Sequence, residues 1–453
     1  MKKVHFVAIG GQGMSGIARI LLQRGQRVSG SDIKESPLLE SLREEGAEIF
    51  IGHRGENVAG ADVVVLSSAI SPDNPEVVAA RRLGIPIVHR VDMLVSVIEG
   101  KRVAAVAGAH GKTTTTAMLA WILTKTGKDP TFLVGGEIPE QGNSREGRGP
   151  DAVVETDESD GSFLKISPDV AVLTNIDDDH LDYWGSVTRL EEAFSRFVRK
   201  VRPGGRVVYN ADDPRLCEIT RGRADCTGYS VEGGGDFRAS GFVQQGWGSC
   251  SNVLRGDRII GKLELSVPGK HNVSNALAAF VAAQELYPEE EHFLDSLRNF
   301  PGVNRRLQRV GVWGGVLVLD DFAHHPNEIR ASLSAVRKAL PQSRVCVLFQ
   351  PHRYSRTRLL KDEFADAFCQ ADQLVITGIY AGPGEKPEEG VDAGFIHEAV
   401  KSFGRPEATY IPDRYDAATV AASKVRNGDV LITMGAGDIS KTHRTIADCL
   451  GDG

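Results

Sequence analysis

The stretch AGAHGKTTTTAML, residues 107 to 119, places a lysine and four threonines at a junction where the sequence changes character. The preceding VAAVAG is apolar and predicts a buried strand, whereas the following AMLAWIL has the spacing of a buried helix face. The turn therefore lies at a helix N-terminus, where backbone N–H groups lack intrahelical partners and the dipole favours an anion. Gly108 and Gly111 let the chain wrap closely, Lys112 supplies positive charge, and Thr113 can place a hydroxyl on a magnesium ion. This pattern predicts a cradle for a nucleoside triphosphate.

The loop is shorter than the standard phosphate-binding pattern G-x-x-x-x-G-K-[ST]. Val106 occupies the position of the first glycine, and the glycine comes instead at Gly108, which gives G-x-x-G-K-T followed by Thr114. A polar helix cap with a solvated lysine is the alternative interpretation of such a motif. The rest of the chain must therefore decide between the two.

Carboxylates and an imidazole follow the next two predicted strands. The stretch AVVETDESDGSFL has four acids directly after a strand, and AVLTNIDDDHLDYWG has three consecutive aspartates followed by a histidine after the next one. These residues are Glu155, Asp157, Glu158, Asp160, Asp177, Asp178, Asp179 and His180. Parallel strands bring their carboxyl ends to one edge of a sheet, and Mg²⁺ prefers oxygen ligands that it shares with phosphates. We therefore predict a magnesium site beside Lys112, with a solvated charged loop as the alternative.

A second nucleotide motif lies near the N-terminus. GGQGMSGIA contains G-x-G-x-x-G at Gly11, Gly13 and Gly16, between a predicted strand and a predicted helix, and Asp32 ends the next strand. Glycines in this pattern admit a pyrophosphate, and the acid holds a ribose. The motif does not identify the pyrophosphate: NAD is one candidate and a UDP-sugar is another. A purely structural tight turn is the alternative.

Later segments carry further polar groups. The helix GKHNVSNALAA offers Asn272 and Asn275, whose amides can make paired hydrogen bonds to an adenine edge, although capping alone explains one of them.

DDFAHHP and FQPHRYSRTR each follow a predicted strand and supply acids, histidines and arginines. They include Asp320, Asp321, His324, His325, His352, Arg353, Arg356 and Arg358. Arginines bind carboxylates and phosphates in a bidentate fork, so this cluster predicts an anion site, with a surface salt-bridge helix as the alternative.

Composition describes an ordinary globular protein of 453 residues, 41% hydrophobic and 25% charged. The formal net charge of -7 argues against a general nucleic-acid binder, because phosphate backbones favour a basic surface. No apolar run approaches 18 residues, so no membrane span is expected. The six cysteines are scattered without a C-x-x-C pair, which predicts reduced thiols in a cytoplasmic protein.

Alternating strand and helix patterns predict three α/β domains with mostly parallel sheets. Residues 1–98 are typical of a Rossmann-like domain. Residues 99–301 follow as a P-loop-type domain with a glycine-rich β stretch at 236–267, and residues 302–453 form a second Rossmann-like domain.

Taken in order, these segments resemble the Mur ligases, the ATP-dependent amide-forming enzymes of peptidoglycan precursor synthesis. The resemblance covers nearly the whole chain, through IGGQGMSGIA, SDI, SSAISPDNPE, GAHGKTTTTAML, ETDESDGSFL, LTNIDDDHLDYW, GKHNVSNALAA, GVNRRL, DDFAHHPNEI, FQPHRYSRTR and TMGAGDI. Ala109 stands where threonine is usual. Within the family, the motifs are most similar to those of the branch that adds L-alanine to UDP-N-acetylmuramate.

The resemblance implies roles for residues in each domain. It implies an ATP site at Gly108, Gly111, Lys112, Thr113, Thr114, Asn272, Asn275, Arg306 and Asp321. It implies a UDP-sugar site at Gly11, Gly13, Gly16, Asp32 and Ser67, and metal ligation by Thr113, Glu155 and His180. Catalytic roles are implied for Lys112, His180, His324, Arg353 and Arg356, the last three near the incoming alanine. The choices between Glu155 and Glu158, and between Arg305 and Arg306, stay open.

The implied reaction uses ATP and Mg²⁺, with two metal ions expected. The lactyl carboxylate takes the γ-phosphoryl group, and the neutral amine of L-alanine attacks the resulting acyl phosphate, with His324 as a candidate general base. The expected partners are UDP-N-acetylmuramate and L-alanine, without nucleic acid or membrane, for a monomer or homodimer. The alternatives are a murein tripeptide recycling ligase and an NAD-dependent oxidoreductase, which would leave Lys112 without a role.

Overall fold

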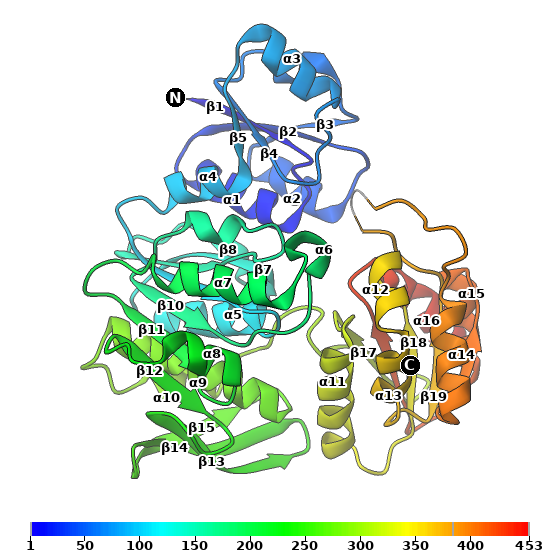
Figure 1. Ribbon diagram of the computed structural model, residues 1–453. Coiled ribbons are helices and arrows are strands. Elements are labelled where there is room, and N and C mark those ends of the chain that lie inside the picture. The colour runs from blue at the N-terminus through cyan, green and yellow to red at the C-terminus, as the bar shows by residue number, and fades with distance from the viewer. Residues whose placement is uncertain (1, 383–384, 452–453) are drawn as a thin grey trace. The chain divides into compact units, whose positions relative to one another are not determined.

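The computed structural model of the protein describes residues 2–382 and 385–451. Within these residues the strands form three sheets that follow one another along the chain (Figure 1). The chain divides into two compact units. One comprises the residues up to Phe242 with Cys250–Leu265 and Asn272–Pro301, and the other comprises Val243–Ser249, Ser266–His271 and the residues from Gly302 onward. The first unit holds the N-terminal sheet and most of the central sheet. The second holds the C-terminal sheet together with Val243–Ser249, at one end of the central sheet.

The N-terminal sheet of the described chain has five parallel strands in the order β3-β2-β1-β4-β5. They are β1 (Lys3–Val7), β2 (Arg27–Asp32), β3 (Glu48–Ile51), β4 (Val63–Leu66) and β5 (Ile87–His89). Apolar residues of α1 (Gln12–Gln23), α2 (Pro37–Glu44) and α4 (Arg90–Val97) form a core on one face, and α3 (Pro75–Leu83) covers the other with η1 (Gly55–Val58). The strand order reverses between β1 and β4. The loops after these two strands therefore flank the crevice in which such sheets bind ligands.

The central sheet has the order β15-β14-β13-β12-β11-β10-β6-β9-β7-β8 over the described residues. Its strands are β6 (Arg102–Ala107), β7 (Thr131–Ile138), β8 (Gly142–Arg145), β9 (Asp151–Glu155), β10 (Val170–Leu173), β11 (Arg206–Asn210), β12 (Cys226–Ser230), β13 (Phe237–Gln245), β14 (Gly248–Arg255) and β15 (Arg258–Leu265). The run from β12 to β7 is parallel, whereas β8 is antiparallel to β7. The predicted glycine-rich β stretch is formed by β13, β14 and β15.

The central domain contains helical segments between and after the strands of this sheet. They are α5 (Lys112–Lys125), η2 (Ser162–Lys165), α6 (Leu181–Trp184), α7 (Val187–Val198), α8 (Pro214–Thr220), α9 (Lys270–Leu286) and α10 (Phe293–Leu297). Helix α5 is buried on almost all sides from Thr113 to Leu123, which is why its sequence is apolar rather than amphipathic. Helix α1 packs on β7 and β8, and there Gly16 is required, because a Cβ at that position would lie 2.1 Å from a methyl group of Leu133. The N-terminal and central sheets thus share one continuous core.

The C-terminal sheet has the order β16-β17-β21-β18-β19-β20 among the described residues, and only β16 is antiparallel to its neighbour. Its strands are β16 (Gln308–Trp313), β17 (Val316–Asp321), β18 (Val345–Phe349), β19 (Gln373–Ile376), β20 (Glu407–Tyr410) and β21 (Val430–Met434). Helices α11 (Pro326–Ala339), α13 (Lys361–Ala367) and α14 (Gly394–Phe403) cover one face, and α15 (Arg414–Ser423) and α16 (His443–Leu450) cover the other. The short α12 (Tyr354–Leu359) and η3 (Ile439–Thr442) follow β18 and β21.

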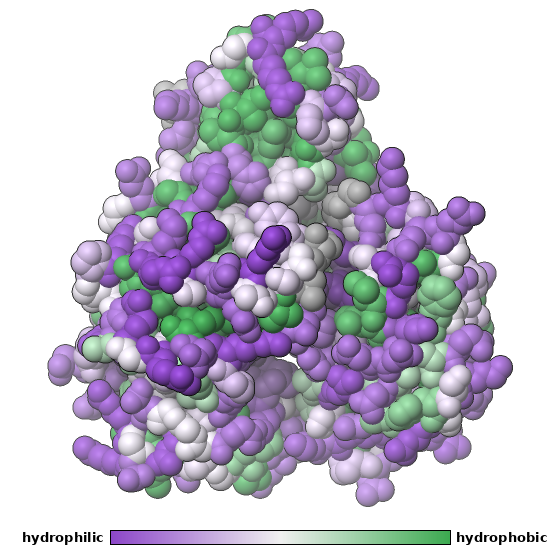
Figure 2. Space-filling view, in the orientation of Figure 1, coloured by the Kyte–Doolittle hydropathy of each residue, from purple (hydrophilic) through white to green (hydrophobic). Residues whose placement is uncertain are grey.

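The predicted fold class is therefore confirmed: the chain is α/β, and along the chain a mostly parallel sheet follows one Rossmann-like sheet and precedes another. The borders predicted at 98 and 301 stay predictions. Figure 2 shows a face that is mainly hydrophilic, with apolar residues gathered mostly over the N-terminal domain. No helix in the described ranges is long and apolar enough to cross a membrane.

Candidate active site

The phosphate-type loop connects β6 to α5, as the sequence predicts. Gly108 has a φ of 142°, and a Cβ there would lie 2.0 Å from Thr174 Oγ1 at the end of β10. Gly111, which precedes α5, has a φ of 80°. Both positions therefore need glycine, because each has a positive φ and a Cβ at either would crowd a neighbouring side chain. Backbone hydrogen bonds from Ala109 and His110 to Asn175 hold the loop against the end of β10, at 3.1 and 2.9 Å.

Lys112 lies folded over this loop. Its Nζ donates to the carbonyls of Gly108 and Ala109, the latter at 3.2 Å, and to Glu158 Oε1 at 2.8 Å. Burial disfavours the charged lysine, but the carboxylates around it, led by Glu158, outweigh burial and hold the pKa of Lys112 above its usual value. Lys112 is thus a permanent cation at the N-terminus of α5.

The two candidate acids of the ETDESD segment separate clearly in space. Glu155 ends β9, and its Oε1 accepts a hydrogen bond from Thr113 Oγ1 at 3.0 Å, while its Oε2 accepts one from the backbone N–H of Gly135 at 2.7 Å. Glu158 instead faces Lys112, and its Oε2 is buried without a partner among the described residues. A hydroxyl and a carboxylate side by side form a donor set that suits Mg²⁺. The geometry therefore favours Glu155 with Thr113 as metal ligands and Glu158 as the partner of Lys112.

His180 lies in the same region. Its Nε2 is 3.9 Å from Glu158 Oε1 and 3.7 Å from Asp179 Oδ2, and its backbone has a φ of 57°. His110 of the phosphate loop contacts Asp177 of the same segment at 2.8 Å. The tertiary structure therefore brings the two acidic segments to Lys112, as predicted, and the metal-binding role of His180 stays a prediction.

The two asparagines of α9 lie beside the start of α5. Asn275 Oδ1 accepts from Thr115 Oγ1 at 3.3 Å, and its Nδ2 donates to Asn272 Oδ1 at 3.3 Å. A Cβ on Gly111 would lie 2.5 Å from Asn275 Oδ1, so the asparagine packs directly on the phosphate loop. Both asparagines are therefore next to the expected ATP site, and their contact with adenine stays a prediction.

The glycine fingerprint of the N-terminal domain begins α1. Asp32 accepts hydrogen bonds from the backbone N–H groups of Gly10 and Ile33, at 2.9 and 2.7 Å, and so lies beside the fingerprint loop. Gly11 and Gly13 lie at the N-terminus of α1, and Ser67 directly follows β4 on the other side of the crevice. The UDP-sugar site predicted at these residues, with its individual contacts, stays a prediction.

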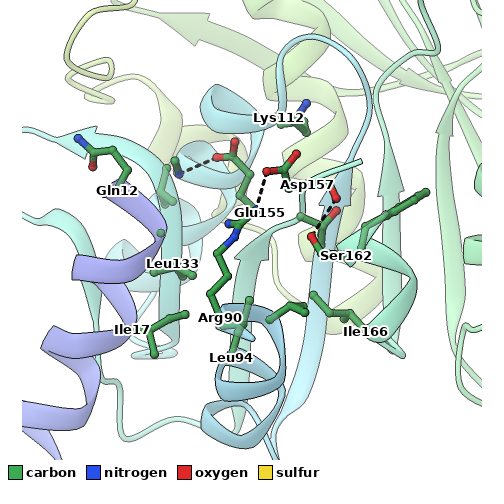
Figure 3. A pocket seen from close by; sticks show the side chains of 16 residues that line it. Gln12, Ile17, Arg90, Leu94, Lys112, Leu133, Glu155, Asp157, Ser162 and Ile166 are labelled. Carbon is green, nitrogen blue, oxygen red and sulfur yellow. Dashed lines mark hydrogen bonds and ion pairs between the residues drawn. The ribbon is translucent and has the colours of Figure 1, made fainter. Parts of the chain in front are cut away.

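A cavity of about 280 Å³ connects the two nucleotide motifs (Figure 3). Gln12 and Gly13 of the fingerprint line it together with Lys112 and Glu155 of the central domain. Its remaining lining residues are Ile17, Arg90, Val91, Leu94, Leu133, Val134, Gly135, Thr156, Asp157, Ser162, Phe163 and Ile166. A ligand bound along the N-terminal crevice can therefore extend toward the phosphate loop.

Two contacts that connect the N-terminal and central domains were not predicted from the sequence. Arg90 Nη2 donates to Asp157 Oδ2 at 2.7 Å, and Ser68 Oγ donates to Asp160 Oδ2 at 2.6 Å. Arg90 directly follows β5, and Ser68 lies in the loop after β4. Their positions just after strands could have marked them as candidates for a site. Their partners could not be predicted, because Asp157 and Asp160 are remote in sequence.

In the second unit, two neighbouring arginines have different surroundings. The guanidinium of Arg305 contacts Asp320 at 3.2 Å and the carbonyls of Gly435 and Gly437 at 2.6 and 3.1 Å. Arg306 is 4.0 Å from Glu328, and the guanidinium groups of both arginines lie over the ring of Phe322. The bonds of Arg305 hold the loop after β21, and the choice between Arg305 and Arg306 for a ligand contact stays open.

Asp321 is buried at the end of β17. Its carboxylate accepts hydrogen bonds from the backbone N–H groups of Leu307 and Ala323, at 2.8 and 2.7 Å, and from Ser332 Oγ at 3.2 Å. Burial raises the pKa of Asp321 to about 6, although Arg306 opposes that shift. These bonds fix the turn that carries Arg306, whereas the expected direct contact of Asp321 with ATP stays a prediction.

The remaining predicted residues gather beyond β17 and β18. The rings of His324 and His352 are 5.5 Å apart, and Arg356 Nη1 lies 3.2 Å from His352 Nδ1. Arg353 has a φ of 71° and precedes α12, whereas Arg358 forms an exposed ion pair with Glu388 at 2.9 Å. His325 caps α11. The fold thus brings His324 close to the arginine motif. Arg358 instead forms a surface salt bridge, which was the alternative interpretation of this cluster.

Three family models match consecutive parts of the chain. The model of the Mur ligase family catalytic domain matches residues 3–102, that of the Mur ligase middle domain matches 106–283, and that of the Mur ligase glutamate ligase domain matches 305–437. Together with the phosphate loop and the fingerprint that meet at one cavity, these matches define the class. The chain belongs to the Mur ligase family and is an ATP-dependent ligase of peptidoglycan precursor synthesis.

Individual relatives narrow the comparison. The chain is 45% identical to the UDP-N-acetylmuramate--L-alanine ligase of Desulfatibacillum aliphaticivorans, over 96% of each chain. It is 44% identical to the ligase of the same name from Pelotomaculum thermopropionicum, over 97% of this chain and 95% of the relative. Among solved structures, the UDP-N-acetylmuramate-alanine ligase of Thermotoga maritima is 33% identical with a TM-score of 0.86 over 99% of both chains. A murein peptide ligase from Psychrobacter arcticus is 25% identical with a TM-score of 0.74, over 100% of this chain and 99% of that one.

Proposed function

We propose that the protein joins L-alanine to the lactyl carboxylate of UDP-N-acetylmuramate, with ATP converted to ADP and phosphate. The observation that carries this proposal is the cavity that Gly13 of the fingerprint and Lys112 of the phosphate loop both line. It allows a sugar nucleotide anchored in the N-terminal domain to present its carboxylate to ATP on the loop. The names of the relatives, each similar over more than nine-tenths of the chain, support the identity of both substrates.

In this proposal the residues of the central domain assist phosphoryl transfer. Lys112 moves from the loop carbonyls and Glu158 onto the transferring phosphoryl group, whose negative charge it stabilises. Thr113 and Glu155 would hold Mg²⁺, which neutralises phosphate charge when bound, and His180 is the proposed ligand of a second ion. Asn272 and Asn275 are the proposed contacts of adenine, beside the loop on α9.

The residues of the C-terminal domain would complete the second step. Attack on the acyl phosphate needs a neutral amine, and we propose His324 as the base that takes its proton. The Nδ1 of His324 is 3.0 Å from the carbonyl oxygen of Phe322, which suits a tautomer with the proton on Nδ1 and Nε2 able to accept. Arg353 and Arg356 would hold the carboxylate of alanine, and Arg306 a phosphate of ATP. These residues belong to the second unit of the chain.

A peptide-accepting ligase is the second candidate, because a murein peptide ligase also shares the fold. Higher identity and a higher TM-score to the alanine ligase favour the first candidate.

The cysteines at positions 217, 226, 250, 346, 369 and 449 are all free, which supports a cytoplasmic enzyme.

Phosphate release by the purified protein tests the proposal. ATP, Mg²⁺ and UDP-N-acetylmuramate are supplied with L-alanine, other amino acids or the tripeptide L-Ala-γ-D-Glu-meso-diaminopimelate in turn. We expect release that requires both the sugar nucleotide and L-alanine. Release only with the tripeptide would assign the protein to the peptide-accepting ligases, and no release with any acceptor would refute the proposed reaction.

A further inference from the structure

The cavity between the two nucleotide motifs has an uneven distribution of charge. The carboxylates of Glu155 and Asp157 line it, and those of Glu158 and Asp160 lie in the adjoining loop. Among its lining residues in the described chain, Arg90 and Lys112 are the cationic side chains. Lys112 belongs to the phosphate loop of ATP. Arg90 is therefore the cationic side chain of the lining that could bind an anionic ligand other than ATP among these carboxylates.

Arg90 is held in a defined orientation by the central domain. It is the first residue of α4, and its Nη2 donates to Asp157 Oδ2 at 2.7 Å (Figure 3). The same nitrogen lies 3.6 Å from Asp160 Oδ2. The two side chains therefore form an ion pair at the wall of the cavity.

The other half of the guanidinium faces the glycine fingerprint. A Cβ placed on Gly13 would lie 3.1 Å from Arg90 Nη1, so this nitrogen closely approaches the N-terminus of α1. A guanidinium carries five N–H donors in a fixed fork, and the bond to Asp157 uses only one nitrogen. Arg90 therefore keeps donors directed to the place where the fingerprint would bring a ligand.

We infer that Arg90 is a substrate-binding residue that holds an oxyanion of the sugar nucleotide against the start of α1, with Asp157 as its positioning residue. This inference rests on the proposed function, and it adds a contact at a residue that no motif of the sequence identified. The oxyanion is either the diphosphate or the lactyl carboxylate, since both present the paired oxygens that a guanidinium binds. A purely structural bridge between the N-terminal and central domains is the competing explanation.

Arg24 provides a matched control for that explanation. Its Nη2 donates to the carbonyl of Val97 at 2.7 Å and to Glu146 at 2.9 Å, so it also links the N-terminal domain to the central one. Arg24 does not line the cavity. Loss of a bridge alone should therefore affect Arg24→Ala and Arg90→Ala in the same way.

Titration calorimetry with the full-length protein tests the inference, using UDP, UDP-N-acetylmuramate and ATP as separate ligands for wild type, Arg90→Ala, Arg90→Lys and Arg24→Ala. We expect Arg90→Ala to weaken UDP-N-acetylmuramate binding about tenfold or more, as for a lost charge-assisted bond, and to leave ATP binding within about twofold. Arg90→Lys should recover part of the loss, and Arg24→Ala should bind like wild type. Weaker binding of UDP as well assigns the diphosphate, and unchanged binding of UDP assigns the lactyl carboxylate.

Two results would overturn the inference while leaving the proposed function intact. One is wild-type affinity of Arg90→Ala for UDP-N-acetylmuramate, and the other is an equal loss in Arg24→Ala. Failure of the wild-type protein to bind UDP-N-acetylmuramate would instead refute the proposed function and the inference together. Thermal unfolding of each variant confirms that the compared proteins are folded.

Discussion

Gly135 is the position at which one added methyl group would test the proposed metal site. Its backbone N–H donates to Glu155 Oε2 at 2.7 Å, and a Cβ there would lie 2.6 to 2.8 Å from the carboxylate atoms of Glu155. Because carbon and oxygen cannot approach so closely, Gly135→Ala must displace the carboxylate and break this bond. The bond orients Glu155 so that its other oxygen faces Thr113.

The expected loss follows from the kind of bond that is broken. A hydrogen bond to a charged acceptor contributes roughly 1.5–3 kcal/mol, and removing a residue that orients a metal ligand lowers metal affinity by about 10- to 100-fold. We therefore expect Gly135→Ala to need about 10- to 100-fold more Mg²⁺ for half-maximal phosphate release. Binding of Mn²⁺ in the presence of ATP, followed by electron paramagnetic resonance, should weaken by a similar factor.

Gly234→Ala is the matched control for this variant. The nearest atom to a Cβ at Gly234 is the carbonyl oxygen of Ala211, at 3.9 Å, so the methyl group fits. The same substitution at this site should leave Mg²⁺ dependence, Mn²⁺ binding and the melting temperature close to those of wild type. Wild-type Mn²⁺ affinity and Mg²⁺ dependence in a folded Gly135→Ala protein would show that Glu155, as placed here, does not hold the metal.

Two further predictions concern the catalytic groups. Lys112→Met should cost about 3–4 kcal/mol of transition-state stabilisation, by analogy with the loss of one oxyanion donor, and should also lower the melting temperature, because Glu158 stays buried without its partner. Adding Glu158→Gln should restore thermal stability but not phosphate release, and recovery of activity in the double variant would contradict the role of Lys112. His324→Gln should change the dependence of rate on pH, because the group that accepts the amine proton is lost. An unaltered pH profile with a normal rate would exclude His324 as the base.

The local sequence determined the phosphate loop, the glycine fingerprint and the alternating α/β pattern. Each depends on neighbouring residues. Gly108 and Gly111 adopt a positive φ that favours glycine, and the apolar residues that follow predict the helix whose N-terminus lies at the loop. The acids after β9 and β10 could also be placed beside Lys112, because parallel strands end at one edge. These features were predicted because short-range geometry and strand direction fix them.

Only the tertiary structure decided which neighbour in each motif faces the site. Glu155 and Glu158 are both acids of one short segment, and it is Gly135 on β7 and Lys112 on α5 that draw them in different directions. Arg90 likewise finds Asp157 67 positions later, across two domains. The direction of a side chain depends on which partners packing brings within hydrogen-bonding distance. That information lies in the assembled core and not in the spacing of residues along the chain.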